Sequence, residues 1–230
     1  MAITVYQPQW GAQRPICGLL FDMDGLVLDS ERLYTRFWME AIHHYGFTIT
    51  KEQALGLRSL GKGPGQAHLT ACCGEGIDYT TIRNKRIELM DAYIDVHGID
   101  PKPGIYELMD YLQEHNIPAA ITSSSPMPNI LRHLTNANLA HRFQKLCSGH
   151  NVPNGKPAPD IYLLGAAELD LDPGNCLALE DSPAGILSAY RAGCLPVIIP
   201  DQDQPDEKTL PLLYAKADSL ADIITLLERK

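Results

Sequence analysis

Short apolar runs alternate with helical patterns along most of this 230-residue chain, and that alternation restricts the fold more than any other feature. Each run is continuously apolar, as expected for a strand that is buried on both faces of a sheet. The strands are predicted at residues 16–21, 118–122, 175–179 and 195–199. The helices between them are predicted at residues 104–115, 160–169 and 183–191. Strands and helices in this order favour an α/β fold with a Rossmann-like, doubly wound parallel sheet and helices on both faces.

One stretch breaks the alternation, because it contains helical patterns with no strand between them. Its first pattern repeats every four residues, at Leu33, Phe37, Ala41 and Tyr45. A second amphipathic run covers residues 82–96, and proline and glycine punctuate the chain at residues 101–104. We therefore predict an all-helical cap domain at residues 33–101, inserted after the first strand of a core formed by residues 1–32 and 102–230.

The composition argues against several classes of protein. A formal net charge of −9, with no basic run or stripe, disfavours nucleic acid and anionic lipid as partners. The longest apolar stretches are about as long as a strand, well short of the roughly 20 residues that a membrane span requires. Residues 1–10 lack a basic region followed by an apolar one, so we expect a cytoplasmic protein, which we also expect to be a monomer.

The cysteines and histidines do not form a metal-binding pattern. Several of the six cysteines lie in apolar runs that are typical of buried strands, so we expect free thiols in a reducing cytoplasm. No Cys-x-x-Cys pair occurs, and the eight histidines show no His-Glu-x-x-His spacing. Zinc is therefore disfavoured.

Two carboxylates, Asp22 and Asp24, follow the first predicted strand directly. In open α/β sheets ligands bind at the carboxyl ends of the strands. Like charges at this spacing repel, so a hard divalent cation with oxygen ligands is implied. Asp24 could offer its backbone carbonyl to the cation while its side chain faces the substrate, and Gly25 allows a tight turn. A polar turn that only caps the strand is the alternative, which this motif alone leaves open.

The strand predicted at residues 118–122 ends in three serines, ahead of a helix that begins near Pro126. A hydroxyl group and successive backbone N–H groups before a helix form an anion-binding arrangement. Ser123 is the candidate phosphate ligand, with Ser124 beside it. Simple helix capping is the alternative, and it is open above all for Ser125.

A single lysine, Lys156, lies in the sequence Asn-Gly-Lys-Pro before the helix predicted at residues 160–169. An ammonium group there would neutralise both a carboxylate nucleophile and the phosphoryl group that it attacks. Most isolated lysines are solvated surface residues, and only the neighbouring motifs favour a functional role for this one.

Two acids, Glu180 and Asp181, follow the strand predicted at residues 175–179. Asp181 is the candidate for direct metal coordination, and Glu180 is a second ligand or the partner of a ligand. Asp181 could instead be the N-cap of the following helix, but capping would not explain an additional acid at the same strand end.

These four segments, in this order, resemble the four signature motifs of the haloacid dehalogenase superfamily, and the resemblance spans the whole core. The matching residues are Asp22-x-Asp24-Gly25, Ser123, Lys156 in Gly-Lys-Pro, and Glu180-Asp181-Ser182. The helical insertion looks like the small cap of that family. The sequences Phe-Asp-Met-Asp-Gly-Leu-Val-Leu-Asp-Ser-Glu, Gly-Lys-Pro-Ala-Pro-Asp and Leu-Glu-Asp-Ser-Pro-Ala-Gly are similar to the β-phosphoglucomutase-like branch and its phosphatases.

The resemblance implies a magnesium-dependent phosphatase that acts on a small phosphorylated metabolite, either a sugar phosphate or a nucleotide-derived monophosphate. It implies that Asp22 is the nucleophile and forms an aspartyl phosphate, and that Asp24 is the acid and base. Mg²⁺ would be held by Asp22, the Asp24 carbonyl and Asp181. Ser123, the adjacent backbone amides and Lys156 would hold the remaining phosphate oxygens.

Two other functions compete with this prediction. A sugar phosphomutase would use the same core residues, but the resemblance then predicts a histidine and a lysine where this chain has Tyr34 and Pro126. A nucleotide-binding protein is a further alternative, because residues 56–63 nearly match a phosphate loop, although Gly63 replaces its Ser or Thr and no strand precedes it. That loop is either a flexible hinge or a loop that binds the substrate over the closed site. In the second case Arg58 is a better candidate than Lys62 for the residue that contacts the substrate.

Overall fold

The computed structural model describes residues 3–6, 15–58, 60–201 and 204–228, so Ser59 of the glycine-rich loop lies outside the described residues. The chain forms two compact units. Met1–Asp29 and Asp100–Lys230 make up the first, the core unit, and Ser30–Ile99 makes up the second, the helical unit. The sequence had placed the inserted domain at residues 33–101.

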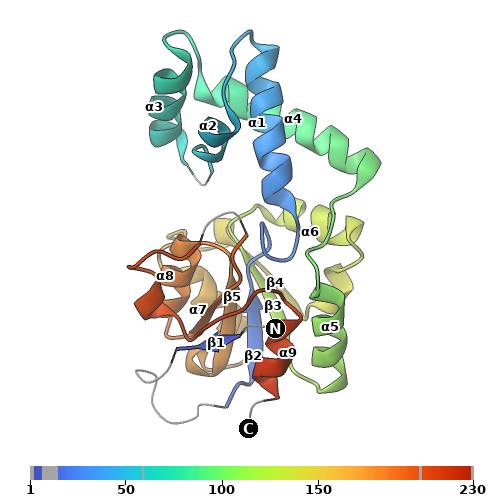
Figure 1. The fold of residues 1–230 in the computed structure, drawn as a ribbon. Helices are drawn as coiled ribbons and strands as arrows, with labels where there is room; N and C mark the ends of the chain where they lie inside the picture. The colour runs from blue at the N-terminus through green and yellow to red at the C-terminus, as the bar shows by residue number, and fades with distance from the viewer. Residues whose placement is uncertain (1–2, 7–14, 59, 202–203, 229–230) are drawn as a thin grey trace. The chain divides into compact units, whose positions relative to one another are not determined.

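A seven-stranded sheet forms the centre of the core unit, in the order β1-β7-β6-β5-β2-β3-β4 (Figure 1). All neighbouring strands are parallel except β1 and β7, which are antiparallel. The strands are β1 (Thr4–Val5), β2 (Gly18–Phe21), β3 (Ala119–Ser123), β4 (Lys145–Ser148), β5 (Cys176–Glu180), β6 (Leu195–Ile198) and β7 (Ala215–Lys216). The predicted parallel α/β sheet is therefore confirmed.

The four predicted strands are the ones whose residues are all buried, namely β2, β3, β5 and β6. Burial on both faces explains why their sequences are continuously apolar. The other three strands were not predicted. β4 begins with the exposed Lys145, and β1 and β7 have two residues each, so none of them carries a readable pattern.

Helices cover the sheet of the core unit on both sides. They are α5 (Ile105–Glu114), α6 (Met127–Asn136), α7 (Asp160–Glu168), α8 (Pro183–Arg191) and α9 (Asp222–Leu227). On one side α7 and α8 pack against each other and against the central strands, while α5 and α9 pack together on the other (Figure 1). Small side chains such as Ala120, Ala166, Ala178 and Ala189 line the buried cluster between α7, α8 and the sheet. This arrangement brings α7 close to the central strands.

The helical unit consists of α1 (Ser30–His44), α2 (Lys51–Leu55), α3 (Lys62–Cys73) and α4 (Tyr79–His97), which pack around their own buried cluster. Thr50 begins α2 with a capping box shared with Gln53, and Asp78 caps α4. No strand occurs among the described residues of this unit. In the part of the chain that the structure describes, no helix is long and apolar enough to cross a membrane.

The two connections that lead into and out of the helical unit are hydrogen-bonded to each other. The N–H of Asp29 donates to the carbonyl of Asp100 at 2.8 Å, and the N–H of Lys102 donates to the carbonyl of Val27 at 2.9 Å. The Lys102 Nζ also lies 2.6 Å from Asp201 Oδ1, in the segment that follows β6. The entrance and exit of the insertion thus form a short antiparallel pair within the core unit.

All six cysteines are free thiols, and three of them, Cys147, Cys176 and Cys194, are buried. Burial raises the pKa of Cys147 to about 11 and that of Cys176 to about 12. Thiolates are the reactive species, so these side chains are unreactive at neutral pH and serve as small apolar core residues.

We expect Gly165→Ala to lower the free energy of unfolding by roughly 1–3 kcal/mol. A Cβ at this position of α7 would lie 2.5 Å from Thr122 Cγ2 and 3.1 Å from Leu20 Cδ2, so the helix would have to move away from the sheet. Gly155→Ala, in the loop before α7, is the control, because apart from its chain neighbours no atom lies within 4 Å of the position that its Cβ would take. Urea unfolding of both variants measures the difference. Equal shifts of the two unfolding midpoints would show that α7 does not pack closely at Gly165.

Candidate active site

The predicted site residues of the core unit lie at the carboxyl ends of three adjacent strands. Asp22 follows β2, Ser123 is the last residue of β3, and Glu180 is the last residue of β5. Strand β2 lies between β3 and β5, because the chain runs from β2 to β3 and β4 and then returns to the other side of β2. Such a reversal of strand order opens a crevice at the strand ends, where α/β proteins bind their ligands.

Lys156 joins two of these strand ends. Its Nζ lies 2.5 Å from Asp22 Oδ1 and 2.6 Å from Glu180 Oε1. The three side chains are buried, with exposed fractions of 9% for Lys156, 12% for Asp22 and 1% for Glu180. A lysine from the loop before α7 therefore neutralises carboxylates at the ends of β2 and β5.

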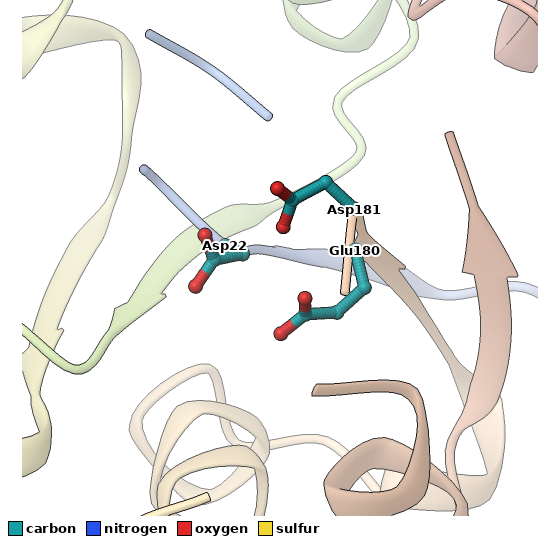
Figure 2. A group of neighbouring side chains, drawn as sticks. All are labelled: Asp22, Glu180 and Asp181. Atoms are coloured by element: carbon teal, nitrogen blue, oxygen red, sulfur yellow. The ribbon is translucent and has the colours of Figure 1, made fainter. Parts of the chain in front are cut away.

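Three carboxylates gather at the ends of β2 and β5 (Figure 2). Ligand oxygens of Asp22, Glu180 and Asp181 all lie within 4.8 Å of one another. Carboxylate oxygens in such a group are the donors that hard divalent cations prefer. The separation of about 160 residues along the chain, from 22 to 181, thus does not prevent these acids from facing one site.

The charge balance of the cluster also fits a divalent cation. Burial raises the pKa of Asp22 to about 8, against the lowering effect of Lys156, and the charges of Glu180 and Asp24 raise it further. Burial works to lower the pKa of Lys156, but the carboxylates of Asp22 and Glu180 outweigh it and raise that pKa. One ammonium group does not balance the acids around it, and a bound Mg²⁺ would favour the charged form of Asp22.

Asp24 is held by a contact that the sequence did not predict. A tight turn follows it, with Gly25 at a φ of 91°, a conformation that favours glycine. The Ser125 hydroxyl donates to Asp24 Oδ2 at 2.9 Å, while the buried Oδ1 has no hydrogen-bond partner among the described residues. Ser125 does not cap α6, whose N-cap is Pro126. The capping alternative had hidden this role, because Ser before Pro is also a common helix start.

The serine loop after β3 is fixed by hydrogen bonds. Ser123 is fully buried, and its Oγ accepts from the backbone N–H of Ser125 at 3.0 Å. The hydroxyl of Ser148, at the end of β4, donates to the carbonyl of Ser125 at 2.7 Å. Ser124 and Lys156 line a cavity of about 220 Å³, together with Gly149, His150, Val152, Gly155 and Ile161. Two of the predicted phosphate-binding residues, Ser124 and Lys156, thus border one cavity in the core unit, whereas the buried Ser123 does not line it.

The N-cap of α8 is Ser182, whose hydroxyl oxygen accepts from the N–H of Gly185 at 3.2 Å. Helix capping therefore does not account for Asp181, which immediately precedes Ser182. Asp181 lies in the acidic cluster with Asp22 and Glu180.

Glu180 accepts hydrogen bonds from Lys156 and Tyr162, and the sequence did not predict the second of these partners. Its Oε1 accepts from Tyr162 Oη at 2.6 Å in addition to Lys156 Nζ. Tyr162 lies in α7 among apolar residues, where an aromatic residue at helical spacing indicates only a core position. The apolar pattern predicts that the ring is buried, but it does not predict a partner for the Tyr162 hydroxyl group.

Arg58 is not in the core unit. It follows α2 in the helical unit, where its Nε donates to the carbonyl of Leu55 at 3.1 Å. The chain enters the glycine-rich loop from α2, and no strand leads into it among the described residues, so the context of a nucleotide-binding phosphate loop is missing. The role of Arg58 in substrate binding stays a prediction.

Comparison with known proteins agrees with the fold and the motifs. Residues 19–199 match the sequence profile of the haloacid dehalogenase-like hydrolases. This match covers most of the chain, including the four motif segments at Asp22, Ser123, Lys156 and Asp181. The chain therefore belongs to the haloacid dehalogenase-like hydrolase family, and the predicted resemblance is confirmed.

Individual relatives are of similar length. Hexitol phosphatase A of Escherichia coli K12 is 34% identical over 191 residues, which cover 77% of this chain and 80% of that protein. The "Probable pseudouridine-5'-phosphatase" of Drosophila melanogaster is 33% identical over 220 residues, with coverages of 91% and 92%. The crystal structure of a β-phosphoglucomutase from Clostridium difficile has the same fold, with a TM-score of 0.73, 21% identity and coverages of 90% and 93%.

Mg²⁺ is expected to raise the unfolding temperature, because a cation that binds the acidic cluster would stabilise only the folded chain. At a hundredfold excess over Kd the gain is about 2.7 kcal/mol, or about 5–10 °C for a chain of this size. Asp181→Asn should remove most of the gain, whereas Asp218→Asn, which alters an exposed carboxylate, should keep it. Thermal unfolding with and without MgCl₂ measures this. A gain in Asp181→Asn as large as in the unmodified chain would refute the metal assignment.

Proposed function

We propose that this chain is a magnesium-dependent phosphatase that hydrolyses a small phosphomonoester through an aspartyl phosphate on Asp22. The environment of Asp24 carries the proposal. Ser125 fixes one oxygen of this carboxyl group, and the other oxygen is buried without a hydrogen-bond partner among the described residues. A general acid and base needs one such oxygen for the reacting group, and an acid two residues after the nucleophile favours phosphoryl transfer over dehalogenation.

In the first half of the reaction, a carboxylate oxygen of Asp22 attacks phosphorus in line. The bond between phosphorus and the ester oxygen breaks, and the protonated Asp24 gives its proton to the leaving oxygen, so that the alcohol departs neutral. Lys156 reduces the repulsion between the anionic nucleophile and the anionic substrate, since its Nζ already lies 2.5 Å from Asp22 Oδ1.

In the second half, the carboxylate of Asp24 takes a proton from a water molecule as that water attacks phosphorus. The bond between phosphorus and the Asp22 oxygen breaks, inorganic phosphate is released, and Asp24 is again protonated. Ser123, Ser124 and the adjacent backbone amides are proposed to hold the phosphate oxygens. Ser124 and Lys156 support this proposal, because both line the cavity of the core unit.

The residues that would hold Mg²⁺ are Asp22, Asp181 and the backbone carbonyl of Asp24. When bound, the cation supplies positive charge that stabilises the transferring phosphoryl group. The clustered oxygens of Asp22, Glu180 and Asp181 support this choice of metal. Glu180 belongs to the same cluster, but the Lys156 ammonium already lies 2.6 Å from its Oε1.

A small phosphorylated metabolite is the proposed substrate, either a sugar phosphate or a nucleotide-derived monophosphate. Two relatives above 30% identity support this range, because one is named a hexitol phosphatase and the other a pseudouridine-5'-phosphatase. The choice within the range is proposed to depend on residues of the helical unit, with Arg58 as a candidate.

A phosphomutase is the second candidate, favoured only by the resemblance of sequence and fold to β-phosphoglucomutases. Tyr34 and Pro126 stand where that resemblance predicts a histidine and a lysine. Both of the predicted residues can carry a positive charge, and neither Tyr34 nor Pro126 can do so. We therefore propose water, rather than a second sugar hydroxyl, as the final acceptor.

Asp22→Asn is expected to reduce the hydrolysis of p-nitrophenyl phosphate by about 10³-fold or more, because an amide oxygen cannot form the phosphoenzyme. The unfolding temperature should stay within a few degrees, because the change is nearly isosteric and Glu180, 2.6 Å from Lys156 Nζ, still balances the ammonium charge. Asp218→Asn makes the same substitution at an exposed site and should retain full activity. Appreciable turnover by Asp22→Asn would reject the nucleophile.

Incubation with β-glucose 1-phosphate and a trace of glucose 1,6-bisphosphate separates the two candidate activities. A phosphatase releases inorganic phosphate and glucose, and only a mutase accumulates glucose 6-phosphate. We expect no glucose 6-phosphate, because Tyr34 and Pro126 replace the residues expected of a mutase. Coupled detection with glucose-6-phosphate dehydrogenase measures it, and accumulation in step with enzyme concentration would favour the mutase.

A further inference from the structure

Tyr162 has no part in the reaction described above, yet it is tied to the residues that perform it. Its side chain is fully buried between α7 and the sheet, and its Oη donates to Glu180 Oε1 at 2.6 Å. The same oxygen accepts from Lys156 Nζ at 2.6 Å, and that ammonium group lies 5.1 Å from the centre of the Tyr162 ring. One carboxylate oxygen is thus shared between the phenol and the lysine.

The phenol is the donor in this arrangement. An ordinary phenol is protonated at neutral pH, and the Tyr162 hydroxyl lies 2.6 Å from Glu180 Oε1, so it donates to this carboxylate. A charge-assisted hydrogen bond of this kind is shorter and stronger than one between neutral groups.

The second oxygen of Glu180 is also engaged. Its Oε2 accepts from the Ser182 hydroxyl at 3.1 Å and faces the Ser182 N–H at 3.4 Å. The absence of a side chain at Gly185 makes room for this carboxylate, because a Cβ there would lie 1.9 Å from it. A carboxylate offers about four lone-pair sites, and four protein donors approach this one.

We propose that Tyr162 is a positioning residue, which fixes the Glu180 carboxylate so that it holds the Lys156 ammonium against Asp22. In this arrangement Glu180 anchors the lysine through the same oxygen that accepts from the Tyr162 hydroxyl. The inference rests on the proposed function, because the catalytic value of a fixed Lys156 depends on phosphoryl transfer. Packing alone would require only the ring of Tyr162, whereas positioning Glu180 requires its hydroxyl group.

Tyr162→Phe tests the proposal, because it removes the one hydroxyl oxygen and keeps the ring. Tyr45→Phe, at a side chain in the helical unit that is 44% exposed, is the matched control. In the full-length, magnesium-loaded enzyme acting on p-nitrophenyl phosphate, we expect kcat of Tyr162→Phe to fall about tenfold, as for the loss of one charge-assisted hydrogen bond. KM and the Mg²⁺ concentration for half-maximal activity should change less than about twofold, and Tyr45→Phe should change nothing.

A second measurement does not depend on activity. In protein labelled with ¹⁵N-lysine, the buried ammonium group of Lys156 should give a slowly exchanging NMR signal, identified by its absence in Lys156→Arg. Tyr162→Phe should shift this signal and accelerate its proton exchange, while Tyr45→Phe should leave both unchanged. Gly185→Ala adds a Cβ that would lie 1.9 Å from the Glu180 carboxylate, so it should displace this carboxylate and shift the Lys156 signal in the same way.

The outcomes separate the inference from the proposed function. Absence of phosphatase activity in the unmodified chain would reject the proposed function, and the ammonium signal would still decide whether Tyr162 positions Lys156. A signal that does not move in Tyr162→Phe overturns the inference, and so does an unchanged kcat in an active enzyme. A rise in the Mg²⁺ requirement at unchanged maximal rate also overturns it, because Tyr162 would then act on metal binding and not on Lys156.

Discussion

The ammonium group of Lys156 allows two carboxylates from different strands to lie side by side inside the protein. Asp22 and Glu180 are buried, and their charges would repel without the cation that lies 2.5 and 2.6 Å from them. Removing one member of a buried ion pair leaves an uncompensated charge, at a typical cost of about 3–5 kcal/mol. The ends of β2 and β5, the loop before α7 and the nucleophile are therefore fixed by the same electrostatic contact.

Close packing of α7 and α8 against the sheet stabilises the contact between Lys156 and the two carboxylates. Helices α7 and α8 approach the sheet at positions where they carry glycine, and the missing side chains leave room for Thr122 and Leu20 beneath Gly165 and for the Glu180 carboxylate beside Gly185. Because α7 lies this close, Tyr162 reaches Glu180 directly, without an intervening water. The Glu180 carboxylate can therefore contact Lys156 only because Gly185 has no side chain.

Much of the core unit could be predicted from the sequence, because strands buried on both faces must be continuously apolar. β2, β3, β5 and β6 followed from that constraint. The parallel topology then placed Asp22, Ser123 and Asp181 at the ends of β2, β3 and β5. The short β1, β4 and β7 have no comparable pattern, since their stability comes from pairing with neighbouring strands. Ser125 and Tyr162 were missed for another reason: helix capping and core packing explain the same residue types equally well without the tertiary contacts.

The paired connections at Val27–Asp29 and Asp100–Lys102 have a consequence for how such a chain can change. Since the two ends of the insertion are hydrogen-bonded to each other, the core closes on itself there, whatever the length of polypeptide between them. When the two ends of a loop are held together in this way, the entropic cost of closing the loop rises only slowly with its length. Inserted segments of different length can therefore be exchanged at this point without breaking the hydrogen bonds that close the core unit.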